Sequence, residues 1–302
     1  MSDQPFDAVL IGGGPANLSA ALALGRARRH VLLTDAGPRR NGAATHVNNF
    51  LTRDHTPPDE MRRIGREQLA KYPTVTLRDE PVLGVSGERG AFRVELPSGV
   101  VDARRLLLGT GMIDEMLPIE GFAERWGHAI YQCPYCHGYE VRDRPWGFLV
   151  SPQNAGHFVP FALQALQWTD RLTVFTHGQM EVDGDTRGLL EARGIRLATA
   201  PIERLVGPGT TLTGVATGGE VIPCDALYAH PPQRQVQLVG ALGLELDDDG
   251  YVRVDEMRRE TSRPGIYAAG DLTTRMQGAI LAAGFGTRAA AMINVELAME
   301  PH

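Results

Sequence analysis

Cysteine is scarce in this sequence, and its scarcity limits what the residue can do. The 302 residues include three cysteines, too few and too odd in number for a disulfide scaffold. Cys133 and Cys136 share a single CxxC motif, so the question is whether this pair performs chemistry. Cys224 stands alone after a proline, in IPCDALYA, and we expect it to be a small core residue.

Long apolar runs are also missing. No stretch reaches the roughly 18 to 20 uninterrupted apolar residues that a membrane span needs. The first residues, MSDQPFDAVLIGGG, have no basic segment followed by a long apolar core, as a secretory signal would. We therefore expect no membrane partner and a cytoplasmic location, where thiols stay reduced unless an enzyme cycles them.

A basic surplus is the third absence. The 30 arginines and lysines, with Lys71 the single lysine, are outnumbered by 36 acidic residues, which gives a net charge of -6. A nucleic-acid binder of the usual kind carries more bases than acids, so no nucleic-acid partner is expected. The 43% hydrophobic content excludes a disordered chain, and 302 residues favour two domains.

Glycine, in contrast, is abundant, with 35 residues or about 12% of the chain against roughly 7% on average. The first glycine-rich turn belongs to the start of a βαβ unit. An apolar strand is predicted over 6–11, apolar residues recur at helical spacing over 18–25, and a second strand over 30–34 ends at Asp35. From about 74 to 108, short β-rich runs broken by glycine and proline predict an antiparallel meander inserted in the unit.

A second βαβ pattern starts at Trp146, with a strand over 148–150, a helix over 158–168 and a strand over 172–175. The chain ends with PGIYAAGD followed by a helical run, AILAAGFGTRAAAMINVELA. The two βαβ starts lie roughly 135 residues apart and predict an α/β protein with two domains of related design.

The first turn, Gly12 to Asn17, lies where a dinucleotide turn is expected, directly after a strand and before a helix. Gly12 can adopt the tight turn, Gly14 lets a pyrophosphate approach the backbone, and the helix N-terminus donates N–H groups. Asp35, 21 residues after Gly14, can accept from ribose hydroxyls. Asn17 takes the third position, which is usually glycine or alanine. The alternative is a glycine-rich turn that holds no ligand.

GGGPA at the start, GTG at 109–111, the CxxC and PGIYAAGD occur in an order that resembles the low-molecular-weight thioredoxin reductases over nearly the whole chain. The resemblance implies a homodimer with two Rossmann-like, three-layer ββα domains, in which FAD binds 1–114 and 239–302, and 115–238 form a second domain carrying the CxxC. Beyond the turn and Asp35, it implies a set of FAD-binding residues: Pro15, Ala16, Ala36, Arg40, Asn41, Asn49, Thr110, Gly111, Gly270, Asp271, Gln277, Gly278 and Ala279.

The CPYCH segment, Cys133 to His137, can carry redox chemistry, because a thiolate stabilised at a helix N-terminus attacks disulfides and a histidine moves protons near neutral pH. By resemblance, Cys136 would face the flavin, Cys133 would meet the substrate, and His137 stands where the reductases usually have an acid. CxxCH also marks c-type haem attachment, but no export signal accompanies it. Zinc would need more ligands than this motif offers, so no metal site is predicted. An inert pair remains an alternative.

The turn where a thioredoxin reductase would bind NADPH differs from the pattern. Residues 151–156, SPQNAG, have no glycine at the first turn positions and contain a proline that removes a donor. The segment after the next strand, THGQME, has no arginine for a 2′-phosphate. We therefore expect a degenerate nicotinamide site in which NADPH use is doubtful.

The sequence combines an FAD turn and a CxxC motif with a nicotinamide turn that departs from the reductase pattern. In this combination it resembles the flavin dithiol oxidases of the gliotoxin and holomycin type, whose CxxCHGYE-like signature reads CPYCHGYE here. The resemblance implies that a small dithiol reduces the cysteine disulfide and that oxygen reoxidises FAD. One alternative is a reductase of thioredoxin or a similar protein, using NADPH, ferredoxin or flavodoxin as electron donor. Another is a flavin-binding protein with inert cysteines.

Overall fold

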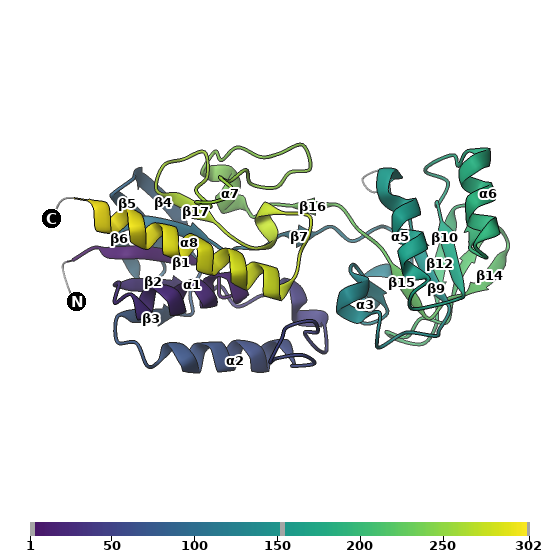
Figure 1. The fold of residues 1–302 in the computed structure, drawn as a ribbon, viewed down its shortest axis with the longest axis horizontal. Helices are drawn as coiled ribbons and strands as arrows, with labels where there is room; N and C mark the ends of the chain where they lie inside the picture. Colours follow the sequence, from purple (N-terminus) through teal and green to yellow (C-terminus); the bar gives the residue numbers. More distant parts are fainter. Residues whose placement is uncertain (1–3, 152–154, 301–302) are drawn as a thin grey trace. The chain divides into compact units, whose positions relative to one another are not determined.

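The computed structural model describes residues 4–151 and 155–300, which form two compact units (Figure 1). Unit 1 comprises Met1–Gly42, Phe50–Ile113 and Gln233–His302, and unit 2 comprises Ala43–Asn49 and Asp114–Pro232. The segment Ala43–Asn49, expected in the FAD-binding domain, therefore groups with unit 2.

Unit 1 is built on a seven-stranded sheet in the order β3-β2-β1-β6-β5-β4, with β17 also paired to β6. The parallel strands are β1 (Phe6–Ile11), β2 (Val31–Thr34), β3 (Val75–Arg78), the carboxyl half of β6 (Gly99–Leu108) and β17 (Ile266–Ala268). The antiparallel meander consists of β4 (Gly84–Glu88), β5 (Ala91–Leu96) and β6. The expectation that the meander begins near residue 74 was wrong, because β3 pairs in parallel with β2. A β-rich sequence predicts a strand but does not show which strand it pairs with.

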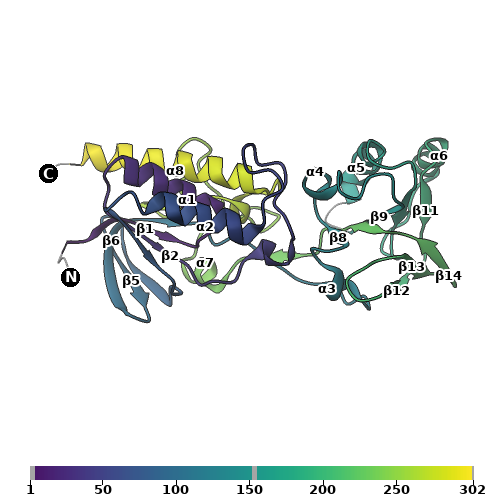
Figure 2. The same cartoon turned by 90° about the horizontal axis from the view of Figure 1, so that it is seen from below.

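Three helices cover one face of this sheet (Figure 2): α1 (Pro15–Arg26), α2 (Pro58–Leu69) and α8 (Ala279–Met299). Alternate residues of β1 point to opposite faces, so Ala8 and Leu10 pack on the helices while Val9 and Ile11 pack on the meander side. A Cβ at Gly286 would lie 1.9 Å from the Ala16 carbonyl oxygen, so the close packing of α8 on α1 depends on glycine there. Short elements complete the unit: η1 (Arg40–Ala43), α7 (Gln237–Ala241) and η3 (Asp271–Thr273).

A buried ionic cluster fixes α8 to the sheet. Arg105 of β6 is fully buried, and its Nε donates to Glu296 Oε1 of α8 at 2.8 Å. Glu296 also accepts from the Tyr267 hydroxyl of β17, and Arg105 pairs with Glu300. Removing one partner of a buried ion pair is costly, so this cluster holds the helix in one register on the strands.

Unit 2 has three layers (Figure 2). Its parallel sheet has the order β11-β10-β9-β15-β8, with β8 (Ile130–Tyr131), β9 (Trp146–Leu149), β10 (Leu172–Phe175), β11 (Arg196–Ala198) and β15 (Ala226–Tyr228). Helices α5 (Phe158–Ala165) and α6 (Gly184–Ala192) lie on one face, and the antiparallel strands β12 (Ile202–Val206), β13 (Gly214–Thr217) and β14 (Glu220–Pro223) lie on the other. The remaining elements are α3 (Phe122–Arg125), α4 (Pro134–His137) and η2 (Ala155–His157), and β7 (Ile113–Asp114) pairs with β16 (Gln233–Arg234).

The prediction of an α/β protein with two Rossmann-like domains of related design is confirmed, since each unit combines a parallel sheet, covering helices and an antiparallel meander. A search of the helices in the described chain finds none that is both long and apolar enough to span a bilayer. Cys224 is fully buried in the core between the two sheets of unit 2.

Candidate active site

The parallel strands of unit 1 end at one edge of the sheet. Ile11 is paired with both Thr34 and Leu108, and Leu108 is paired with Ala268. Ligands of open α/β sheets bind outside the carboxyl ends of the strands. Most residues predicted to bind FAD lie in the turns that follow these four strands: Gly12, Gly14, Pro15 and Ala16; Asp35 and Ala36; Thr110 and Gly111; Gly270 and Asp271.

The first of these turns leaves room for a phosphate. Gly12 has a φ of +111°, and a Cβ there would lie 2.5 Å from the Gly109 carbonyl oxygen. Asn17 is fully buried and its Nδ2 donates to the Gly12 carbonyl at 2.9 Å, so asparagine supports the turn from inside. A Cβ at Gly14, however, would meet no atom within 4 Å. The Thr110 Oγ1 is buried without a hydrogen-bond partner within the described chain. These features fit an FAD pyrophosphate at the N-terminus of α1.

Asp35 is placed beside the turn, and it is already hydrogen-bonded. Its Oδ1 accepts from the Gly37 N–H at 2.8 Å, and its Oδ2 accepts from the Arg62 guanidinium, with Nε at 3.0 Å. Each carboxylate oxygen can accept more than one hydrogen bond, so the role of Asp35 toward ribose hydroxyls stays a prediction. Arg62 lies on α2, 27 residues from Asp35, and sequence reasoning missed it.

A cluster of hydrogen-bonded polar side chains in unit 1 contains three of the residues predicted to bind FAD. Arg40 Nη1 pairs with Asp271 Oδ2 at 3.0 Å and also donates to Gln277 Oε1. The Gln277 and Gln233 side-chain amides exchange hydrogen bonds of 2.9 and 3.1 Å. The Tyr251 hydroxyl donates to Gln233 Oε1 at 3.0 Å. Gln233 and Tyr251 were not predicted, because nothing in their local sequence marks them.

The other predicted cofactor residues are placed as follows. Gly278 precedes α8 and Ala279 is its first residue, so both lie at a helix N-terminus. Ala36 and Asn41 are exposed in unit 1. Asn49 is exposed, has a φ of +59° and groups with unit 2, so it is the one residue of the predicted set outside unit 1.

The cysteine pair lies in unit 2, just past the carboxyl end of β8. Cys133 precedes the four-residue helix α4, and Cys136 lies within it. Both are half-buried and present as thiols. A hydrogen bond from the Cys136 side chain, helped by the Cys136 and Tyr135 N–H groups, lowers the pKa of Cys133 to about 7 although burial opposes this. Near neutral pH, a large fraction of Cys133 is therefore the nucleophilic thiolate.

His137 lies in an environment that keeps its ring neutral. Burial first, and the nearby His46 second, lower the pKa of His137 to about 4. Its ring stacks on Tyr131 with centroids 4.5 Å apart, and its Nε2 is buried without a partner in the described part of the structure. In this dithiol form His137 is neutral and only a weak base at neutral pH. Its acid/base role therefore stays a prediction.

Aromatic residues far apart in the sequence surround the dithiol turn. Tyr228 of β15 is fully buried, and burial together with the charges of both cysteines raises the pKa of its hydroxyl. Tyr135, between the cysteines, contacts Trp168 edge-on at 5.5 Å and is itself 59% exposed. Its hydroxyl accepts from Gln164 Nε2 of α5 at 2.9 Å. These contacts fix an exposed ring beside the reactive sulfurs.

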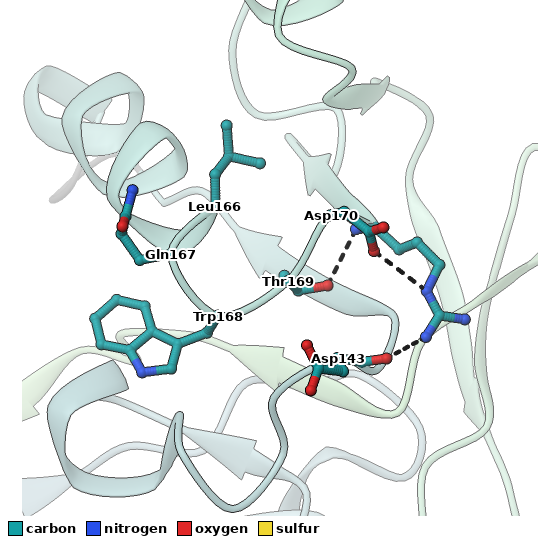
Figure 3. A pocket seen from close by; sticks show the side chains of 7 residues that line it. Asp143, Leu166, Gln167, Trp168, Thr169 and Asp170 are labelled. Atoms are coloured by element: carbon teal, nitrogen blue, oxygen red, sulfur yellow. Dashed lines mark hydrogen bonds and ion pairs between the residues drawn. The ribbon is translucent and has the colours of Figure 1, made fainter.

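Trp168 also lines a polar depression of about 440 Å³ at the carboxyl end of α5 (Figure 3). Thr169 accepts from the Arg171 N–H at 3.0 Å, and the Arg171 guanidinium donates to the Asp143 carbonyl. Figure 3 shows Leu166 and Gln167 on the helical side and Asp143 and Asp170 on the other. Trp168 therefore lines the depression and also contacts Tyr135 of the dithiol turn.

The region of unit 2 that the sequence predicts to be a degenerate nicotinamide site is described only in part. Pro152, Gln153 and Asn154 lie outside the described residues, so the predicted degenerate turn is seen only at its ends. After β10, the His177 Nδ1 accepts from the Ile202 N–H at 2.8 Å and is thereby committed to the backbone. A depression of about 600 Å³ follows, lined by both Arg187 and Glu181. Arg187, on α6, was not predicted because it lies beyond THGQME, the segment in which arginines for a 2′-phosphate were expected.

Neither unit shows a metal site among its described residues. Over residues 4–151 and 155–300, no group of three or more histidine, cysteine or acidic side chains is arranged to hold a metal ion. A nucleotide cradle on one parallel sheet and a reactive dithiol at the edge of a second parallel sheet define the class of two-domain disulfide oxidoreductases.

Comparisons with known proteins agree with this class. The family model described as pyridine nucleotide-disulphide oxidoreductase matches residues 6–157 and 166–286, and the chain belongs to this family. Thioredoxin reductase sirT of Leptosphaeria maculans is 32% identical over an alignment of 309 positions, which covers 96% of this chain and 94% of that protein. The chain is therefore an FAD-dependent oxidoreductase of the thioredoxin reductase type.

Solved structures are similar over the same length. An oxidoreductase from Agrobacterium tumefaciens has a TM-score of 0.90 and 37% identity, covering 99% of this chain and all of that one. HlmI has a TM-score of 0.89 and 36% identity, covering 99% of this chain and 94% of that one. Both identities are high enough for the likeness to extend beyond the fold to the family.

Proposed function

We propose that this protein oxidises a dithiol substrate by cycling Cys133 and Cys136 between disulfide and dithiol, without NADPH. The observation that carries the proposal is a CxxC dithiol turn at α4, in a unit whose described nicotinamide region has His177 Nδ1 bonded to the backbone and Arg187 in the same depression as Glu181. A 2′-phosphate calls for guanidinium partners, whereas His177 is bonded to the backbone and Arg187 shares its depression with Glu181.

The thiol chemistry balances without further groups. A substrate thiolate attacks the Cys133 sulfur of the protein disulfide, a mixed disulfide forms, and Cys136 leaves as thiolate. The second substrate thiol then attacks the sulfur that the substrate has bonded to Cys133, and Cys133 leaves. A leaving thiol of low pKa departs faster, which favours Cys133 as the exchanging residue. The substrate has lost two electrons and two protons, and the protons pass to the cysteine thiolates that leave or to water.

FAD, when bound, supplies the two-electron acceptor for the cysteine dithiol and passes the electrons to oxygen, which gives hydrogen peroxide. The protein residues proposed to hold FAD lie at the carboxyl edge of the unit 1 sheet and in the group around Arg40, Asp271 and Gln277. Their contribution is to bind and orient the cofactor. Asn49 remains part of this proposal by resemblance alone.

The second candidate is a reductase that passes electrons to thioredoxin or a similar protein, from NADPH, ferredoxin or flavodoxin. It is favoured by the name of sirT, which is called a thioredoxin reductase. A flavin-binding protein with inert cysteines is disfavoured by the lowered pKa of Cys133. A cytoplasmic location and a homodimer complete the proposal as inferences from resemblance.

Aerobic turnover distinguishes oxidation from reduction. With dithiothreitol as the probe dithiol, the FAD-loaded protein should form one hydrogen peroxide for each dithiol consumed, with no NADPH present. The ratio follows because each substrate disulfide releases two electrons and oxygen accepts two. Thiol titration and a peroxidase-coupled assay measure the two quantities. Peroxide formation or disulfide turnover that begins only when NADPH is added would support the reductase instead.

A further inference from the structure

The segment Ala43–Asn49, which we call the strap, is built into unit 2 although segments of unit 1 flank it in the sequence. Val47 is buried, and Ala43 packs so tightly against Gly127 that a Cβ on that glycine would lie 2.8 Å from the Ala43 Cβ. His46 lies near enough to His137 to disfavour its charged form. The strap is therefore a packed part of the dithiol surroundings.

Asn48 connects the strap to the dithiol turn. Its Nδ2 donates to the Cys136 carbonyl oxygen at 2.7 Å. Because the last carbonyls of a helix have no partner within the helix, a side chain that reaches one of them from outside stabilises that end.

The turn depends on such help because it is short. Helix α4 has four residues. The backbone hydrogen bonds at its ends run from the Cys136 N–H to the Cys133 carbonyl at 3.2 Å and from the Gly138 N–H to the Pro134 carbonyl at 2.7 Å. A single turn fixes many dihedral angles for few hydrogen bonds, so it is unstable alone. The bond from Asn48 crosses 88 residues of sequence to the carbonyl of the second cysteine.

We infer that Asn48 is a positioning residue, which holds the turn in the geometry where the Cys136 thiol hydrogen-bonds to the Cys133 sulfur. It thereby keeps Cys133 reactive near neutral pH. The inference rests on the proposed function in one respect, the assignment of Cys133 as the exchanging thiol. In this role Asn48 acts through the backbone of Cys136.

Other titratable groups lie near the two cysteines, and these groups remain the same in an Asn48 variant. His137 and Tyr131 stack beside the turn, and His46 lies on the strap. Tyr228 lies beneath the cysteines, and its pKa responds to both of them and to Glu140. A change of the Cys133 titration in an Asn48 variant therefore reports on the position of the turn.

The test is the pH profile of alkylation in the fully reduced, FAD-loaded protein under anaerobic conditions, where oxygen cannot return the cysteines to the disulfide. Iodoacetamide labelling of Cys133, resolved from Cys136 by fragment mass spectrometry, should have a midpoint near pH 7. In Asn48→Ala the midpoint should rise by about half to one pH unit, the scale of one lost hydrogen bond. Below the midpoint this is roughly a three- to tenfold loss of labelling rate. Asn48→Gln, which keeps an amide donor, should recover part of the shift.

Gln179→Ala is the matched control, since it removes an exposed amide from unit 2 away from the turn. An unchanged midpoint in Asn48→Ala, or an equal shift in Gln179→Ala, would overturn the inference. Should Asn48→Ala not fold, Asn48→Leu, which keeps the volume and removes the donor, replaces it with the same expected shift. Alkylation needs neither substrate nor electron acceptor. If the proposed function is wrong, the turnover assay will show it, and the alkylation profile will still test whether Asn48 positions the dithiol turn.

Discussion

Replacing Cys133 or Cys136 by serine should lower dithiol oxidation at least about 10³-fold, the scale on which loss of a nucleophile acts. A serine hydroxyl can neither form the disulfide nor leave as a thiolate. The two variants should differ when incubated with a linear disulfide such as bis(2-hydroxyethyl) disulfide, whose leaving half diffuses away as a free thiol. Cys136→Ser keeps the exchanging thiol and should accumulate a mixed disulfide with the probe, whereas Cys133→Ser should accumulate far less. Intact-protein mass spectrometry measures the adduct.

The matched control is Cys224→Ala, because Cys224 is the third thiol of the chain and is fully buried. Burial raises the pKa of its thiol, so it stays protonated and unreactive. Turnover in Cys224→Ala should remain within about twofold of the unchanged protein once the folded fraction is corrected. The roles given to the pair are contradicted if either serine variant keeps its turnover, or if Cys224→Ala loses as much as they do.

Gly14→Val should weaken FAD binding by about 100-fold while leaving the protein fold intact. A Cβ at this position meets no protein atom within 4 Å, and the φ of −80° suits any residue, so the substitution causes no clash in the protein itself. The added side chain instead occupies the space into which the pyrophosphate must come, and overpacking of this kind costs about 1–3 kcal/mol. Titration of the apoprotein with FAD, followed by flavin fluorescence, measures the dissociation constant.

Gly240→Val serves as the control for this substitution. Gly240 is exposed in unit 1, and a Cβ there also meets nothing within 4 Å. Its FAD dissociation constant should match that of the unchanged protein. Circular dichroism of each apoprotein shows whether the fold persists. Equal FAD affinity in Gly14→Val and Gly240→Val would mean that the cofactor does not approach the first turn.

Features written in consecutive residues could be predicted from the sequence. The strand, glycine turn and helix from Phe6 to Arg26 are local, and the observed elements follow the predicted ones closely. The final helix was equally plain from its apolar, alanine-rich run. Cys133 and Cys136 were identified because only two residues separate them and no other cysteine pair exists in the chain.

Features that depend on distant residues were not predicted. Arg62 reaches Asp35 from another helix, and Gln233 reaches Gln277 across 44 residues. In HVNNF the sequence pointed to Asn49, whereas Asn48 is the asparagine that contacts the dithiol turn. Burial, and then His46 far away in the chain, lower the pKa of His137, and no local motif encodes this environment. Tertiary packing, not motif, decides such contacts and charges.

The central claim is that a dithiol, and not NADPH, delivers electrons to the bound flavin. The most direct measurement is anaerobic, with the FAD-loaded protein observed at the flavin absorption band near roughly 450 nm. The proposed function predicts that NADPH leaves this band unchanged over the time of many turnovers, and that dithiothreitol then bleaches it. Rapid bleaching by NADPH alone would contradict the proposed function and identify the protein as a reductase.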